Sequence, residues 1–346
     1  ENYSMDAYQR WGGREHILIQ GWLPATQSLI WLTASLGGGV LAMRVGMSVV
    51  GALAVTAGAW VARSIAGKAA GWLFVPFGLF GPFLTWSVVP YQESMFLLFL
   101  FGGTALALHA QNASLPAKNR MWILVDLVAG ALPLVRYEGW PVTLLYIIWR
   151  RNPRALVATW GALLWLGIKW VGVESNASSP IDYADWEGLN TRFSTTVLSA
   201  SLAKLWTQMV DTKGILLLVF GVAGWVHLLR SKRPWIVWLG LVFVGQVAAL
   251  GGWIIGLETA TYRMQAVPGM LLGLFVAGSS GLLWAQHGVR TRSAIAVGGI
   301  LLAILFTVQG FDNSKRSTRA VRWEVRLVET MSKCPECTYL IKPREG

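Results

Sequence analysis

Three short polar clusters interrupt an otherwise apolar chain and hold the side chains best suited to chemistry. They are Pro90-Tyr91-Gln92-Glu93-Ser94, Arg136-Tyr137-Glu138-Gly139 and Glu258-Thr259-Ala260-Thr261-Tyr262-Arg263. A carboxylate that accepts a proton, together with guanidinium groups that neutralise a departing phosphate, is the set that group transfer from a phosphate requires. The clusters therefore predict chemistry or ion handling where the fold brings them to one face.

Asp6 and Arg136 are the first candidates for this chemistry. Asp6 lies in the polar N-terminal segment and is the candidate general base; the alternative is a helix cap, because Asp6 precedes an amphipathic pattern over 7–20. Arg136 ends a hydrophobic stretch, where a guanidinium can bind phosphate oxygens in a bidentate manner. The alternative for Arg136 is an arginine that reaches the headgroup level and pairs with Glu138.

The remaining candidates support these two. Arg263 is expected to be a second phosphate contact, with Glu258 as its ion-pair partner, while Tyr262 is either a contact or an interfacial anchor. For Glu93 and its neighbour Tyr91, a functional and a structural role are both open. Tyr137 and Glu138 are expected to orient Arg136 or to contact substrate hydroxyls.

The composition shows what kind of molecule must position these residues. Hydrophobic residues make up 54% of the 346, charged residues 13%, and the mean hydropathy is +0.51, which excludes an ordinary soluble domain. Twenty tryptophans fit many crossings of a water–lipid boundary. The net charge of +12 is distributed in short clusters between apolar stretches, so it indicates membrane topology and no nucleic-acid partner.

Apolar stretches of membrane length predict an all-α polytopic integral membrane protein with about ten helices. One of the stretches contains Asp126, which we interpret as a residue that hydrogen-bonds to another helix. The stretches cover approximately 43–62, 69–89, 94–110, 121–135, 138–149, 155–173, 213–229, 235–257, 265–286 and 293–310.

The distribution of Lys and Arg predicts the orientation, because positively charged loops stay in the cytoplasm. The short loops of the opposite set hold little basic charge beyond Arg136 and Arg263, so the three polar clusters are expected to face away from the cytoplasm. This places residues 1–42, the large loop 174–212 and the tail 311–346 outside, around a transmembrane body 43–310. We also expect a hydrophobic segment before Glu1, either a signal peptide or, preferably, a first transmembrane helix. The basic loops contain Arg63 and Lys68; Lys118 and Arg120; Arg150, Arg151 and Arg154; Arg230, Lys232 and Arg233; and Arg290 and Arg292.

The order and common side of these motifs resemble the GT-C glycosyltransferases. The motifs run from Asp6-Ala-Tyr8-Gln-Arg10 and Gly21-Trp22-Leu23-Pro24-Ala-Thr-Gln27, through the clusters at Glu93 and Arg136, to Tyr262-Arg263-Met-Gln-Ala-Val-Pro268. Within that superfamily the chain is most similar to the protein O-mannosyltransferase and aminoarabinose-transferase branch. The resemblance spans nearly the whole chain and rests on the order of short motifs.

The resemblance implies an enzyme that transfers a hexose, such as mannose, or a pentose from a polyprenyl-phosphate donor to a protein, lipid or glycan acceptor. It implies an inverting reaction at the outer face of the cell membrane, or of the ER membrane in a eukaryote, with the clustered tyrosines and glutamates near the sugar. A divalent cation is left open, and no histidine cluster predicts a metal site. The alternative is a secondary transporter or lipid flippase that uses intramembrane acidic residues, although no paired halves are visible in the sequence.

Overall fold

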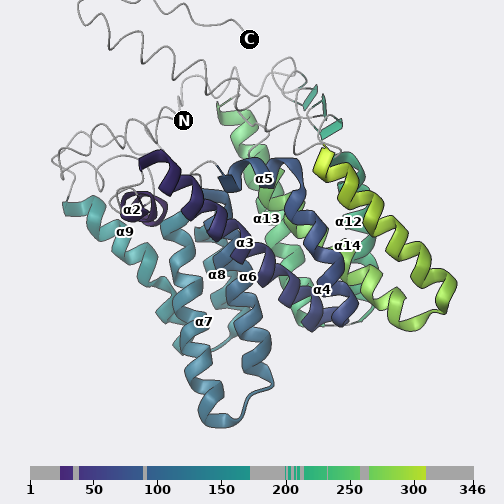
Figure 1. Cartoon of the computed structure of the whole chain (residues 1–346). Coiled ribbons are helices and arrows are strands. Elements are labelled where there is room, and N and C mark those ends of the chain that lie inside the picture. The colour runs from purple at the N-terminus through teal and green to yellow at the C-terminus, as the bar shows by residue number, and fades with distance from the viewer. Residues whose placement is uncertain are drawn as a thin grey trace, which may run out of the picture.

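The computed structural model describes residues 24–33, 39–88, 92–171, 214–231, 233–257 and 265–308, with a few further residues between 199 and 210. Over these ranges the chain is a bundle of helices joined by short turns (Figure 1). The regular helices are α2 (Pro24–Thr33), α3 (Gly39–Ala66), α4 (Lys68–Phe74), α5 (Gly81–Val88), α6 (Gln92–Gln111), α7 (Leu115–Val135), α8 (Gly139–Arg150), α9 (Trp160–Val171), α12 (Gly214–Leu229), α13 (Pro234–Leu257), α14 (Ala266–Gln286) and a helix Val289–Val308.

The all-α prediction is confirmed, and the apolar stretches predicted from the sequence are mainly helical over their described residues. Four helices are long and apolar enough to cross a membrane: Leu41–Ala66 within α3, all of α6, all of α14, and Val289–Val308. The shorter apolar helices include Gly214–Leu229 and Pro234–Ala249. These lengths and compositions place the protein in a membrane.

The predicted stretch 69–89 differs from the expectation, because it is not one helix. It consists of α4, a 3-10 helix η2 (Val75–Leu79) and α5. Pro76 lies in η2 and Pro82 in the first turn of α5, and each proline removes a backbone donor from the helical hydrogen-bond ladder. These prolines divide the predicted span into three pieces.

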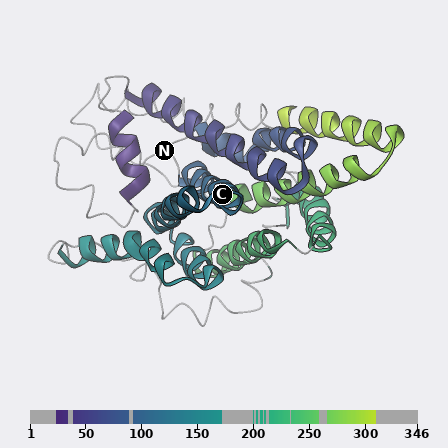
Figure 2. The same ribbon diagram turned by 90° about the horizontal axis from the view of Figure 1, so that it is seen from below.

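The bundle is arranged around α6, α7 and α14. Seen from below, α6 and α7 lie near the centre, with α3 on one side and α9 and α13 on the other (Figure 2). Most of α14 is buried, and it contacts α3, α4 and α12. In contrast, nearly all of Val289–Val308 is exposed outside the bundle, which suits a helix in lipid.

Phenylalanine rings packed on glycine faces form the core beside α14. Phe77 and Phe80 are 1% exposed, and their rings meet that of Phe306 at centroid distances of 5.8 and 5.4 Å. A Cβ on Gly273 would lie 2.6 Å from the Phe77 ring, and a Cβ on Gly269 would lie 2.3 Å from the Phe80 ring. Glycine is required here because the rings occupy the space of a side chain, as is usual where membrane helices pack closely.

The α7–α8 hairpin forms a second packed region, and it carries one of the polar clusters at its turn. Residues 136–138 connect the two helices, and the backbone N–H of Gly139 donates to the Arg136 carbonyl at 2.9 Å. The short helix α2 contacts α7 and α3 at this end of the bundle, and Thr26 donates to Met95 Sδ in α6 at 3.8 Å. Helix α2 is therefore attached at the same end of the bundle as Arg136.

Candidate active site

Arg136 lies between two carboxylates that come from different helices. Its Nε donates to Glu138 Oε2 at 3.1 Å, its Nη2 donates to Glu138 Oε1 at 2.7 Å, and its Nη1 donates to Glu93 Oε1. All three side chains are buried, with exposed fractions of 5% for Arg136, 1% for Glu93 and 8% for Glu138. The structure therefore joins two of the three sequence clusters into one charged cluster, Glu93–Arg136–Glu138.

The ends of three helices favour these charges. Glu93 lies in the first turn of α6, Glu138 is the N-cap residue of α8, and Arg136 is the C-cap residue of α7. A helix carries partial positive charge at its N-terminus and partial negative charge at its C-terminus. Each side chain thus lies at the helix end that stabilises its charge, which offsets part of the cost of burying it.

The cluster also fixes the ionisation of Arg136. Burial lowers the pKa of the guanidinium, but the charges and hydrogen bonds of Glu138 and Glu93 outweigh burial, so the pKa lies above its ordinary value. Next to it, burial raises the pKa of Tyr137 to about 12, so this phenol stays protonated at neutral pH. A charged donor of fixed geometry and a neutral phenol therefore stand side by side in the turn.

A row of close contacts between α7 and α8 extends from this turn along the hairpin. Gly139 packs so closely on α7 that a Cβ would lie 2.3 Å from the Leu132 carbonyl oxygen. The Thr143 hydroxyl donates to the Ala129 carbonyl at 2.8 Å.

Further along, the Tyr146 hydroxyl donates to Asp126, and the Arg150 guanidinium stands 3.5 Å from the ring centroid of Trp122. Residues 139, 143, 146 and 150 share one face of α8, because they follow the three- and four-residue spacing of a helix. We call the four contacts the hairpin ladder. Asp126 was predicted to hydrogen-bond between helices, and its bond to Tyr146 confirms this.

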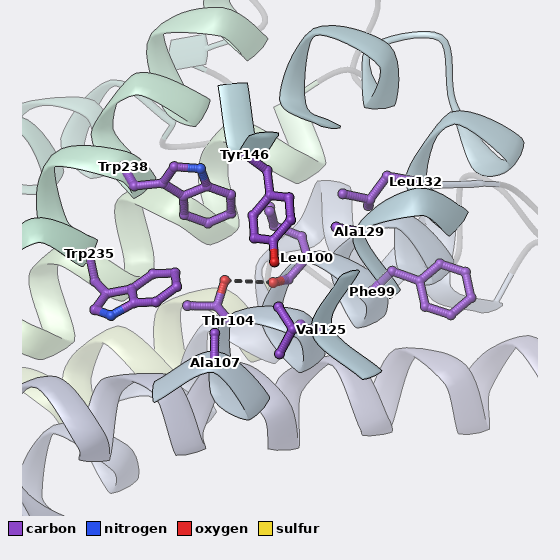
Figure 3. A pocket seen from close by; sticks show the side chains of 11 residues that line it. Phe99, Leu100, Thr104, Ala107, Val125, Ala129, Leu132, Tyr146, Trp235 and Trp238 are labelled. Carbon is purple, nitrogen blue, oxygen red and sulfur yellow. Dashed lines mark hydrogen bonds between the residues drawn. The ribbon is translucent and has the colours of Figure 1, made fainter. Parts of the chain in front are cut away.

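A small apolar cavity lies beside the ladder, between α6, α7, α8 and α13 (Figure 3). The Tyr146 ring enters it with the hydroxyl directed toward Leu100 and Thr104, and Trp235 and Trp238 close the opposite side. Its volume is about 20 Å³, which admits a water molecule but no lipid chain. The cavity is therefore a packing gap, and the candidate site is the charged cluster at the turn.

The other predicted site residues lie outside the described residues, so their convergence with Arg136 stays a prediction. They are Asp6, Tyr91, Glu258, Tyr262 and Arg263. Among the described residues, no group of three or more His, Cys, Asp and Glu side chains is arranged to hold a metal ion.

Sequence reasoning missed Thr143 and Gly139, which hold the hairpin together. Their spacing of four residues along α8, directly after a turn of three residues, is the signal that could have indicated them. Neither residue type is chemically conspicuous, so this spacing was the available signal, and the contacts with Leu132 and Ala129 come from the folded hairpin.

The fold is similar to the crystal structure of ArnT from Cupriavidus metallidurans in the apo state. The TM-score is 0.53 and the sequence identity 14%, over 86% of this chain and 56% of that chain. This chain therefore corresponds to little more than half the length of that protein. The likeness confirms the GT-C-like helical fold that the sequence resemblance implied. The chain matches no family model and no curated protein significantly.

Proposed function

We propose that this protein is a membrane glycosyltransferase of the GT-C type. It transfers a monosaccharide, either a hexose such as mannose or a pentose, from a polyprenyl-phosphate donor to a protein, lipid or glycan acceptor. The observation that carries the proposal is the ArnT-like fold over 86% of the chain. The Glu93–Arg136–Glu138 cluster gives it a chemical centre, because it joins sequence clusters that were expected to act together.

The proposed reaction forms a bond between an acceptor oxygen and the anomeric carbon, and breaks the bond from that carbon to the phosphate oxygen. The electron pair leaves with the polyprenyl phosphate, and the acceptor proton goes to the Asp6 carboxylate. Attack opposite to the leaving group inverts the anomeric centre. Arg136 and Arg263 stabilise the charge that develops on the departing phosphate.

Arg136 retains hydrogen-bonding capacity for this role. Its bonds to Glu93 and Glu138 use three of the five guanidinium N–H groups, which leaves two for phosphate oxygens. Arg136 acts on the donor through directed hydrogen bonds, and Arg263 adds the second positive charge that attracts the phosphate.

The site is proposed to face away from the cytoplasm. The ends of α7 and α8 that lie away from this turn are both basic. Helix α7 has Lys118 and Arg120 near its start, and α8 ends at Arg150 and Arg151. Such residues are retained on the cytoplasmic side. The turn at 136–138 then lies at the outer face, where a lipid-linked sugar is available without a soluble nucleotide.

The direct test offers the purified full chain in bilayer nanodiscs a panel of radiolabelled polyprenyl-phosphate sugars, with membrane lipids and peptides as acceptors. We expect transfer from one donor class, and loss of transfer in Asp6→Asn. Full transfer by Asp6→Asn would exclude Asp6 as the base. Failure of every donor would contradict the proposed function, provided that the protein is shown to be folded.

The transporter alternative receives no support from the described residues. Two of its candidates, Asp126 and Glu93, are used in packing contacts: Asp126 accepts a hydrogen bond from the Tyr146 hydroxyl and is 2% exposed, and Glu93 pairs with Arg136. A carboxylate in such a contact is accounted for by helix packing.

A further inference from the structure

Pro133 and Thr143 form a complementary pair across the hairpin. Pro133 lies inside α7 and has no backbone N–H, so it cannot donate to the carbonyl of Ala129 four residues earlier. The Thr143 hydroxyl, from α8, donates to that carbonyl at 2.8 Å, and the Thr143 side chain is 4% exposed. A side chain of the next helix thus replaces the donor that the proline removed, as membrane helices require where water is excluded.

This pair lies close to Arg136 along α7. Only two residues separate Pro133 from Arg136, and the Arg136 backbone N–H donates to the Leu132 carbonyl at 3.2 Å. A proline inside a helix also pushes against the carbonyl of the residue four positions earlier, which turns the following residues away from ideal helix geometry. The direction of the last turn of α7 therefore decides where the guanidinium begins, and Thr143 bonds from α8 to Ala129, in the turn before it.

Satisfying a lone carbonyl and connecting two helices are different tasks. An alanine in place of Pro133 would satisfy the Ala129 carbonyl within α7 and leave α8 without this bond. The native arrangement brings the donor from α8, which carries Glu138 at its N-terminus. The bond therefore links the position of Arg136 to the helix that carries one of its two carboxylate partners.

We propose that Thr143 is a positioning residue for Arg136: its bond to the Ala129 carbonyl holds the end of α7 that contains Pro133 against α8, so that the guanidinium lies between Glu93 and Glu138. Where the proposal concerns donor binding, it rests on the proposed function. Thr143 itself does not touch substrate.

The first test is Thr143→Val, which keeps the shape and removes the hydroxyl. We expect the KM for the polyprenyl-phosphate donor to rise about tenfold while kcat changes less than about twofold, because a displaced Arg136 loses its donor contact. Thr143→Ser restores the hydroxyl and should return the donor KM to that of the wild type. An unchanged donor KM in Thr143→Val would overturn the proposal.

The decisive variant is Pro133→Ala/Thr143→Val, in which the new N–H of residue 133 can satisfy the Ala129 carbonyl. Its resistance to unfolding should return toward wild type, while its donor KM stays raised because the bond from α8 is absent. If the donor KM also recovers, Thr143 merely satisfies a carbonyl and the positioning role is refuted. This variant also carries the test if Thr143→Val alone fails to fold.

Thr104→Val is the matched control. Thr104 is a buried threonine whose hydroxyl donates at 2.7 Å to the Leu100 carbonyl within its own helix, where the backbone already supplies a donor. The same substitution there should leave the donor KM and the unfolding constant unchanged. A KM effect as large as that of Thr143→Val would show that any buried threonine gives the result, and would overturn the assignment.

A readout independent of activity separates this inference from the proposed function. Glu93→Gln and Arg136→Gln form a double-mutant cycle, whose coupling is the ratio of unfolding constants beyond additivity. We expect that coupling to fall toward one in the Pro133→Ala/Thr143→Val background. A coupling as strong as in the native background would refute the positioning role even if no donor were found. If the coupling between Glu93 and Arg136 falls in that background but the native chain transfers no sugar, the positioning role is supported and the proposed function is contradicted.

Discussion

The α7–α8 hairpin and the phenylalanine–glycine core beside α14 solve the same packing problem in different ways. In the core, rings such as Phe77 rest on bare glycines, and shape alone decides which helices meet. In the hairpin, each contact of the ladder except that of Gly139 is directional: a hydroxyl on a carbonyl, a phenol on a carboxylate, a guanidinium on an indole.

The difference indicates what each region is for. Lipid tails are as apolar as the side chains they surround, so membrane helices associate through close packing and hydrogen bonds. Packing suffices where only stability is needed. Directional bonds fix the angle and register of two helices, and they occur where the hairpin must hold Arg136 against Glu93 and Glu138. Damage to the two regions should therefore have different consequences.

The largest effect is expected from Arg136→Ala, which leaves two buried carboxylates without their shared partner. Removing one member of a buried ion pair costs about 3–5 kcal/mol of folding free energy. Transfer activity should be lost as well. Denaturant unfolding in detergent micelles measures the first effect, and donor turnover measures the second. Arg136→Lys, which keeps the charge without the planar fork, should be intermediate, and wild-type stability of Arg136→Ala would contradict the burial of this cluster.

Phe77→Ala should cost about 3 kcal/mol of stability, because it opens a cavity against Gly273 and Phe306. Unlike Arg136→Ala, it should leave the turnover of each folded molecule unchanged. The measurement is activity normalised to the folded fraction. Phe220→Ala is the control, since Phe220 is 62% exposed on α12 and should tolerate the change. Loss of specific activity in Phe77→Ala would erase the distinction between the two regions.

Gly139→Ala tests the one packing contact of the hairpin ladder. The new Cβ would lie 2.3 Å from the Leu132 carbonyl oxygen and 2.4 Å from its carbon, so α8 must move away from α7. We expect a loss of about 2 kcal/mol and a raised donor KM. Gly102→Ala, in α6 with nothing within 4 Å of the added carbon, should be neutral in both measurements. Equal effects at the two glycines would point to backbone flexibility as the cause.

The smallest effect concerns alkaline pH and Tyr137, whose pKa burial raises from 10.0 to about 12. The folded state holds the phenolic proton more tightly than the unfolded chain does. This contribution to stability is therefore intact below about pH 10 and is lost as the pH rises toward about 12. Tyr137→Phe should lose less stability than the wild type over that window in parallel thermal melts. Identical alkaline profiles would show that the phenol is solvated when folded.

Much of this architecture could be predicted from the sequence, because a bilayer permits few alternatives. Apolar stretches of the right length had to be helices. The chemistry of the turn was predicted in part: Arg136 and Glu138 are neighbours in the chain, and their pairing was one of the two expected arrangements.

The contacts between distant residues could not be predicted. Glu93 is 43 residues from Arg136, and nothing in its own cluster indicates which helix end it meets. Thr143 was missed for a related reason, since its role exists only because Pro133 removes a donor on the neighbouring helix. Such complementarity depends on the register between two helices, which the hydrophobic pattern of either helix leaves undetermined.

The division of the stretch 69–89 has a consequence for biogenesis. A helix rises about 1.5 Å per residue, so the seven residues of α4 and the eight of α5 each reach only about a third of the way across a hydrocarbon layer roughly 30 Å thick. The pieces instead pack against α3, which is synthesised before them, and against α14, which is synthesised nearly two hundred residues later. Their final packing therefore requires α14. A nascent chain halted before α14 should expose this segment to proteolysis.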